Sequence, residues 1–125
     1  MSGTTVYLCD DVAAMRLLLR AVLEVHPDLD IVGEAGDGRT ALTEVERLRP
    51  DVLVLDISLP ELDGLEVLEE LAERAPETRV VVFSGFAAEQ LEEAVLARGA
   101  QCYIEKGADI EVVARAVRNV AREVA

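Results

Sequence analysis

Five polar residues of this chain have side chains suited to binding a divalent cation and a phosphoryl group. Each follows a short run typical of a β-strand: Asp10 and Asp11 follow residues 6–9, Asp56 follows residues 52–55, Ser84 follows residues 80–83, and Lys106 follows residues 102–105. In a parallel sheet the carboxyl ends of the strands share one edge, and α/β proteins bind ligands there. Three carboxylates, a hydroxyl group and an ammonium group would then meet in one cleft.

The three carboxylates predict a magnesium site. Close together they repel one another, and without a cation some of them would take up protons. Mg²⁺ removes this conflict, because it prefers oxygen ligands in an octahedron and keeps several waters. We expect Asp11 and Asp56 to be direct ligands and Asp10 to act through a water molecule.

The same cleft is suited to phosphoryl transfer. A carboxylate can attack a phosphoryl group and form an aspartyl phosphate, and this transfer needs the equatorial oxygens to be stabilised. The metal, the Ser84 hydroxyl and the Lys106 ammonium would supply three such contacts. Lys106 is the only lysine of the chain, whose other basic residues are all arginine.

Length and composition exclude several classes of protein. We expect the 125 residues to form one domain, residues 1–125, with no output domain. The net charge of −13 argues against direct binding of nucleic acid, which requires patches of lysine and arginine. No apolar run is long enough to span a membrane, and the first residues do not resemble a signal peptide. These features predict a soluble cytoplasmic protein.

Strand-like and helix-like segments alternate five times, as in a series of βαβ units. The predicted strands are Thr5–Cys9, Leu29–Glu34, Val52–Asp56, Arg79–Phe83 and Gln101–Ile104. The predicted helices are Val12–Val25, Gly38–Leu48, Leu65–Arg74, Ala88–Arg98 and Asp109–Val124. Asp37 and Asp63 are plausible N-caps, and Gly99 suits the end of the fourth helix.

The composition of the strands also predicts their order. The first, third and fourth strands are almost continuously apolar, as expected for strands covered on both faces. The second and fifth contain polar residues, as edge strands do. This pattern indicates an α/β fold of the flavodoxin-like (βα)5 type, a doubly wound parallel five-stranded sheet in the order 2-1-3-4-5.

With these residues in place, the whole chain resembles the receiver domain of two-component response regulators. The resemblance rests on the pair Asp10-Asp11, the segment Leu55-Asp56-Ile57-Ser58-Leu59-Pro60, the turn Asp63-Gly64, the pair Ser84-Gly85, and Lys106. It implies that Asp56 is the phosphoacceptor and that the backbone carbonyl of Ser58 is a further Mg²⁺ ligand. It also implies that Ser84 and Tyr103 act as the switch, with Tyr103 turning inward from the sheet surface after phosphorylation.

The resemblance further implies partners. A sensor histidine kinase or a histidine phosphotransfer protein would donate the phosphoryl group. The fourth helix, fifth strand and fifth helix would form the face that changes on phosphorylation and binds an effector or a second copy of the chain. The fifth helix carries more apolar residues than one buried stripe requires. It also carries arginines that could pair with the acidic fourth helix of a second copy. The chain would be a signalling switch and not a turnover enzyme.

Two positions depart from the family pattern. Gly107 stands where receivers usually have a proline after a cis peptide bond, and a cis bond before a non-proline residue costs about 3 kcal/mol. Ser84 replaces the more common threonine but keeps the hydroxyl group.

Three other functions use similar residues. A magnesium-dependent phosphatase of the haloacid dehalogenase type needs an acid two residues after its nucleophile, where this chain has Ser58. A flavodoxin-like cofactor binder would not place Asp10-Asp11 beside a phosphate. A receiver-like scaffold that works without phosphate would not need the complete site.

Overall fold

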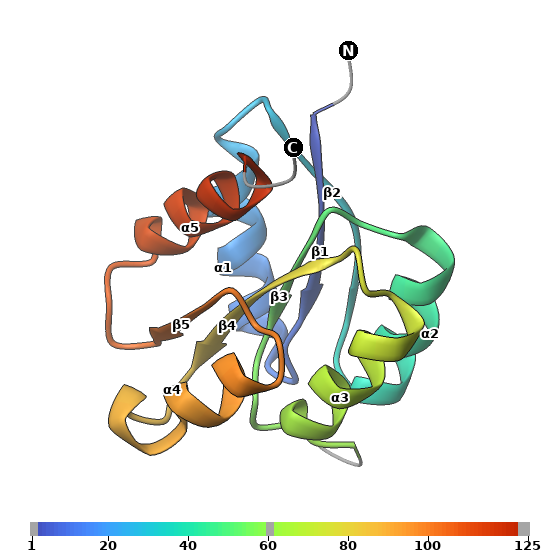
Figure 1. Cartoon of the computed structure of the whole chain (residues 1–125). Helices are drawn as coiled ribbons and strands as arrows, with labels where there is room; N and C mark the ends of the chain where they lie inside the picture. Colours follow the sequence, from blue (N-terminus) through green and yellow to red (C-terminus); the bar gives the residue numbers. More distant parts are fainter. Residues whose placement is uncertain (1–2, 60–61, 123–125) are drawn as a thin grey trace.

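A computed structural model describes residues 3–59 and 62–122, in which five strands and five helices alternate along the chain (Figure 1). The strands are β1 (Thr4–Cys9), β2 (Leu29–Ala35), β3 (Val52–Leu55), β4 (Arg79–Ser84) and β5 (Cys102–Glu105). The helices are α1 (Ala13–Glu24), α2 (Gly38–Leu48), α3 (Gly64–Arg74), α4 (Ala88–Ala97) and α5 (Glu111–Arg122). All strand pairs are parallel, and the sheet order is β2-β1-β3-β4-β5. The predicted fold class and strand order are therefore confirmed.

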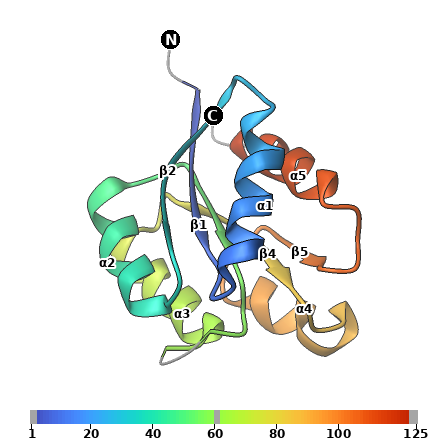
Figure 2. The same cartoon turned by 180° about the vertical axis from the view of Figure 1, so that it is seen from behind.

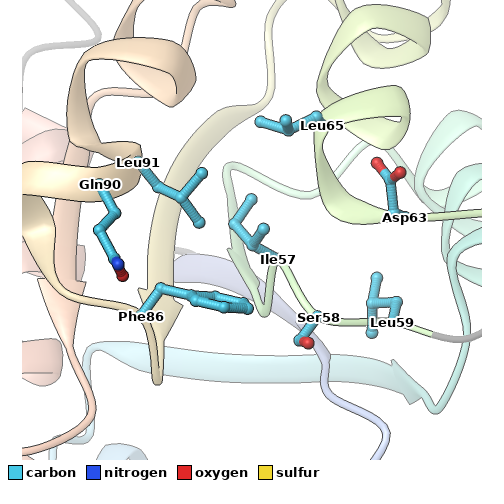
Figure 3. Close-up of a pocket in the computed structure, with 8 residues that line it drawn as sticks. All are labelled: Ile57, Ser58, Leu59, Asp63, Leu65, Phe86, Gln90 and Leu91. Atoms are coloured by element: carbon cyan, nitrogen blue, oxygen red, sulfur yellow. The ribbon is translucent and has the colours of Figure 1, made fainter.

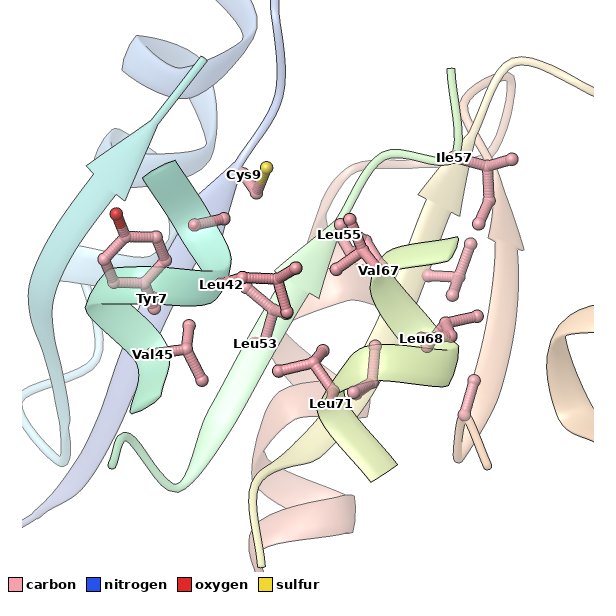
Figure 4. Packing of buried hydrophobic residues seen from close by; sticks show 14 of the residues in the cluster. Tyr7, Cys9, Leu42, Val45, Leu53, Leu55, Ile57, Val67, Leu68 and Leu71 are labelled. Atoms are coloured by element: carbon pink, nitrogen blue, oxygen red, sulfur yellow. The ribbon is translucent and has the colours of Figure 1, made fainter. Parts of the chain in front are cut away.

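The helices cover both faces of the sheet (Figures 1 and 2). Helices α1 and α5 pack on one face, and α2, α3 and α4 pack on the other. Within β3, Leu53 and Leu55 belong to the core beneath α2, α3 and α4, which Figure 4 shows, whereas Val52 and Val54 belong to the core beneath α1 and α5. Burial on both faces explains why the central strands are apolar at successive positions.

Most element ends lie within two residues of their predicted positions. Asp37 and Asp63 cap α2 and α3 by accepting hydrogen bonds from the backbone N–H groups of Thr40 and Glu66. Gly99, after α4, has a φ of 101°, a conformation that glycine adopts without strain. Two residues named in the sequence analysis lie outside the described residues. They are Pro60, the last residue of the segment that begins at Leu55, and Val124, the predicted end of the fifth helix.

Two further findings concern the peptide bonds and the possibility of a membrane-spanning helix. The described residues contain no cis peptide bond, so the Lys106–Gly107 bond is trans. The described part of the chain also contains no helix that is both apolar enough and long enough to cross a bilayer.

Candidate functional site

The predicted acidic cluster forms at the carboxyl edge of the sheet. Carboxylate oxygens of Asp10, Asp11 and Asp56 lie within 4.8 Å of one another. Asp10 and Asp56 follow the ends of the adjacent strands β1 and β3, and the Asp56 N–H donates to the Cys9 carbonyl at 2.9 Å. Asp10 and Asp56 are only 1% and 3% exposed, whereas Asp11 is exposed to solvent. Two acidic side chains are therefore buried where a cation could neutralise them.

Lys106 closes this cluster from β5. Its Nζ donates to Asp10 Oδ2 at 2.8 Å and to Asp56 Oδ2 at 3.2 Å, and it lies 5.8 Å from the centre of the Phe83 ring. Burial lowers the pKa of Lys106, but the hydrogen bond and charge of Asp10, together with the charge of Asp56, outweigh this effect and raise the pKa overall. The ammonium therefore stays charged and joins the two buried carboxylates.

The two adjacent acids that follow β1 differ in their surroundings. Asp10 Oδ1 accepts the Val12 N–H at 2.9 Å, and its Oδ2 accepts from Lys106. Both Asp10 oxygens therefore have protein donors. Asp11 is exposed and lies next to the same cluster. The assignment of Asp11 as a direct metal ligand and of Asp10 as a ligand through water stays a prediction.

Opposing effects act on the pKa of Asp56. Burial is the largest influence and raises its pKa, and the nearby Asp10 charge acts in the same direction. A hydrogen bond from the Ser58 N–H to Asp56 Oδ1, 3.1 Å long, and the charge of Lys106 both lower the pKa and only partly offset burial. A divalent cation at this cleft would favour the ionised carboxylate, which is the nucleophilic form.

Ser84 and Tyr103 both contact the backbone of Phe86, in the loop between β4 and α4. Ser84 is fully buried, and its Oγ accepts the Phe86 N–H at 3.1 Å. The Tyr103 hydroxyl donates to the Phe86 carbonyl at 2.7 Å, and the residue is only 9% exposed. The Tyr103 ring is thus already packed inward, and not at the surface position that we expected before phosphorylation. Its hydroxyl donates to a backbone carbonyl there, which compensates for lost solvation.

A partly apolar pocket of about 490 Å³ lies beside the loop that follows β3. Figure 3 shows the Phe86 ring pointing toward Ile57 and Ser58, which also line this pocket. Phe86 is 44% exposed. Ser58 also lines the pocket, and its backbone N–H contacts Asp56. Phe86 and Ser58 therefore line the same pocket, and Ser58 connects it to Asp56.

Cys9 immediately precedes Asp10 of the acidic cluster, and its thiol is buried. Its pKa is raised to about 12, first by burial and then by the charges of Asp37, Asp10 and Asp56. Its Sγ donates to the Asp37 carbonyl at 3.6 Å. A thiol with so high a pKa stays protonated at neutral pH, and the thiolate is the nucleophilic form.

The family described as "Response regulator receiver domain" matches residues 6–118. The chain belongs to this receiver domain family. The match includes the three aspartates of the acidic cluster, and it also includes Lys106.

Individual relatives agree with this assignment. The receiver domain is 34% identical over 117 residues to the nitrate/nitrite response regulator protein NarL of Escherichia coli K12, covering 94% of this chain and 54% of that protein. It is 36% identical over 117 residues to a protein-glutamate methylesterase/protein-glutamine glutaminase of Alkalilimnicola ehrlichii, covering 88% of this chain and 30% of that protein. The chain therefore spans about half or less of the length of these relatives.

Solved structures show the same fold. The signal receiver domain of the putative response regulator NarL from Mycobacterium tuberculosis superposes with a TM-score of 0.92 at 27% identity, covering 98% of both chains. Membership of this family favours the receiver interpretation over the phosphatase and the flavodoxin-like alternatives.

Sequence reasoning missed one contact in this receiver domain. Helix α4 follows Ala87, which has no side chain able to cap it, and the carboxylate of Glu105 from β5 accepts the Ala88 N–H instead. The available signal was an acidic residue at the end of the neighbouring strand, beside a helix without a polar N-cap.

Proposed function

We propose that this receiver domain is a phosphorylation-activated signalling switch whose acceptor is Asp56. The observation that carries the proposal is the contact of Lys106 with the buried carboxylates of Asp10 and Asp56, beside the exposed Asp11. A structural ion pair would need only one carboxylate for one ammonium. The additional carboxylates make the cleft suited to a divalent cation, and we propose no substrate turnover by this region.

The residues of the cleft fit Mg²⁺, which binds oxygen ligands and carries charge opposite to theirs. Asp11 and Asp56 would be direct ligands with the backbone carbonyl of Ser58, and Asp10 would act through water. When bound, Mg²⁺ would neutralise charge on the phosphoryl oxygens. The Asp10 side chain has another task, because its oxygens position Lys106 and the start of α1.

In the proposed transfer, a carboxylate oxygen of Asp56 forms a bond to phosphorus. The bond between phosphorus and the imidazole nitrogen of a phosphohistidine breaks, and its electron pair leaves with the imidazole. Lys106 can stabilise the negative charge of the transferred phosphoryl group. Its ammonium already contacts Asp56 Oδ2 and can donate to a phosphoryl oxygen from the same side. The Ser84 hydroxyl would donate to another oxygen after releasing the Phe86 N–H.

Intact-mass measurement tests the acceptor assignment. Wild-type protein incubated with acetyl phosphate and Mg²⁺ should gain one phosphoryl group, and Asp56→Asn should gain none. Asp63→Asn is the matched control, because it removes a carboxylate outside the cleft and asparagine also caps helices well. Equal modification of Asp56→Asn and wild type would reject the assignment. No modification of either would favour the phosphate-independent scaffold.

We propose a sensor histidine kinase or a histidine phosphotransfer protein as the donor, docking on α1. This helix begins beside the acidic cluster, and it leaves Leu17 and Leu18 exposed by 70% and 47%. Leu17→Arg should slow phosphotransfer from a kinase that phosphorylates the wild type, while phosphorylation by acetyl phosphate stays unchanged. Val25→Arg is the control, because Val25 is equally exposed but lies at the far end of α1.

We propose the α4-β5-α5 face as the surface that reports phosphorylation to an effector or a second copy. A shallow groove of about 370 Å³ lies there between β5 and α5, lined in part by Ile104, Val112 and Ala116. Not every arginine of α5 is available to a partner copy, because Arg118 already pairs with Asp28 at 3.0 Å. Arg115 and Arg122 are exposed.

A further inference from the structure

Helix α4 depends on a neighbouring strand for its N-terminal cap. The first N–H groups of a helix have no partner within the helix. In α2 and α3 a local aspartate supplies one, but the residue before α4 is Ala87. Glu105 Oε2 accepts the Ala88 N–H at 2.5 Å. A carboxylate is also favoured at this end of a helix by the helix dipole.

Glu105 lies next to the residue that contacts the acceptor. Its neighbour Lys106 donates from Nζ to Asp56 and from its backbone N–H to the Ser84 carbonyl, at 3.2 Å and 2.7 Å. One peptide unit therefore separates an ammonium in the acceptor cleft from a carboxylate at the start of α4. Tyr103 adds a second connection between β5 and the loop before α4, through the Phe86 carbonyl.

We propose that Glu105 is a positioning residue that couples Lys106 at the acceptor cleft to the first turn of α4. This inference rests on the proposed phosphorylation of Asp56. In this proposal Lys106 exchanges part of its contact with Asp10 and Asp56 for a contact with a phosphoryl oxygen, and the end of β5 shifts with it. The Glu105 carboxylate adjusts with it and changes its contact with Ala88. Helix α4 then responds to phosphorylation at its N-terminus, independently of the contact between Tyr103 and Phe86.

The Ala88 amide provides a direct probe, because its hydrogen-bond acceptor is Glu105. Glu105→Ala should speed exchange of this amide by roughly fivefold, the effect of losing a cap worth about 1 kcal/mol. Glu105→Gln keeps an acceptor oxygen without the charge and should retain most of the protection. Glu93→Ala is the matched control, since it removes an exposed carboxylate from α4 without touching the cap.

The decisive measurement compares amide chemical shifts before and after phosphorylation by acetyl phosphate and Mg²⁺, with phosphorylation quantified by intact mass. In wild type and Glu93→Ala we expect shifts at residues 88–91. In Glu105→Ala these should fall to less than half, with phosphorylation unchanged, and Glu105→Gln should restore them in part. Normal phosphorylation of Glu105→Ala with wild-type shifts at 88–91 would overturn the coupling alone. Absence of phosphorylation in the wild type would overturn both proposals.

Discussion

Replacing Lys106 by methionine should destabilise the protein strongly at neutral pH. Methionine keeps an unbranched apolar stem beside Phe83 but removes the charge that joins Asp10 and Asp56. Both carboxylates are almost completely buried, so each would then lie next to another negative charge without a counter-ion. Removing one partner of a buried ion pair costs about 3–5 kcal/mol. Lys106 is 20% exposed, so we expect the lower end, about 3 kcal/mol.

The expected change in melting temperature follows from the size of the chain. The unfolding entropy of about 2.1 cal/mol/K per residue gives about 0.26 kcal/mol/K for 125 residues. A loss of about 3 kcal/mol then lowers Tm by about 11 °C. Thermal and urea unfolding followed by circular dichroism, without Mg²⁺, measure this effect. Arg98→Met is the control, because it breaks a surface pair with Glu69 and should cost less than about 1 kcal/mol.

The destabilisation should depend on pH. Burial already raises the pKa of Asp56, and loss of the Lys106 charge raises it further. Between the unfolded pKa, about 3.9, and this higher folded value, the folded variant binds more protons than the unfolded chain. Its stability therefore rises as pH falls through this window, and the difference from wild type should shrink toward about pH 4. A loss no larger than that of Arg98→Met, or one independent of pH, would refute the buried-charge reasoning.

Three further predictions concern the cleft and its surroundings. Asp11→Asn should weaken Mg²⁺ binding in calorimetric titrations by about tenfold or more, equivalent to about 1.4 kcal/mol, and Asp10→Asn should weaken it less; the reverse order would exchange their assigned roles. Phe86→Ala should shorten the lifetime of purified phosphorylated protein and Phe86→Glu should shorten it further, because the Phe86 ring points toward Ser58, two residues beyond Asp56, and should limit the approach of water; unchanged decay in both variants would show that the ring does not shield the acceptor. Cys9 should resist alkylation by iodoacetamide at pH 8 in the folded protein and react in urea, as peptide mass mapping can establish; rapid modification of the folded protein would contradict its burial.

The sequence alone was sufficient to predict the fold and the position of the acidic cluster. Continuous apolar runs such as 52–55 are stable only when covered on both faces, and this placed β1, β3 and β4 in the centre of the sheet. Because parallel strands end at one edge, Asp10, Asp56 and Lys106 had to lie at the same end of the molecule. These inferences depend on local patterns of apolar residues and on the shared edge at which parallel strands end.

The tertiary structure decided how the individual side chains are used. Asp10 and Asp11 are adjacent and chemically identical, yet one is buried against Lys106, 96 residues away, and the other is exposed. Tyr103 lies inward because the Phe86 carbonyl accepts its hydroxyl, and Glu105 reaches α4 because Ala87 offers no cap. Such choices depend on which donors and acceptors residues distant in sequence bring to each side chain, and neither periodicity nor residue type contains that information.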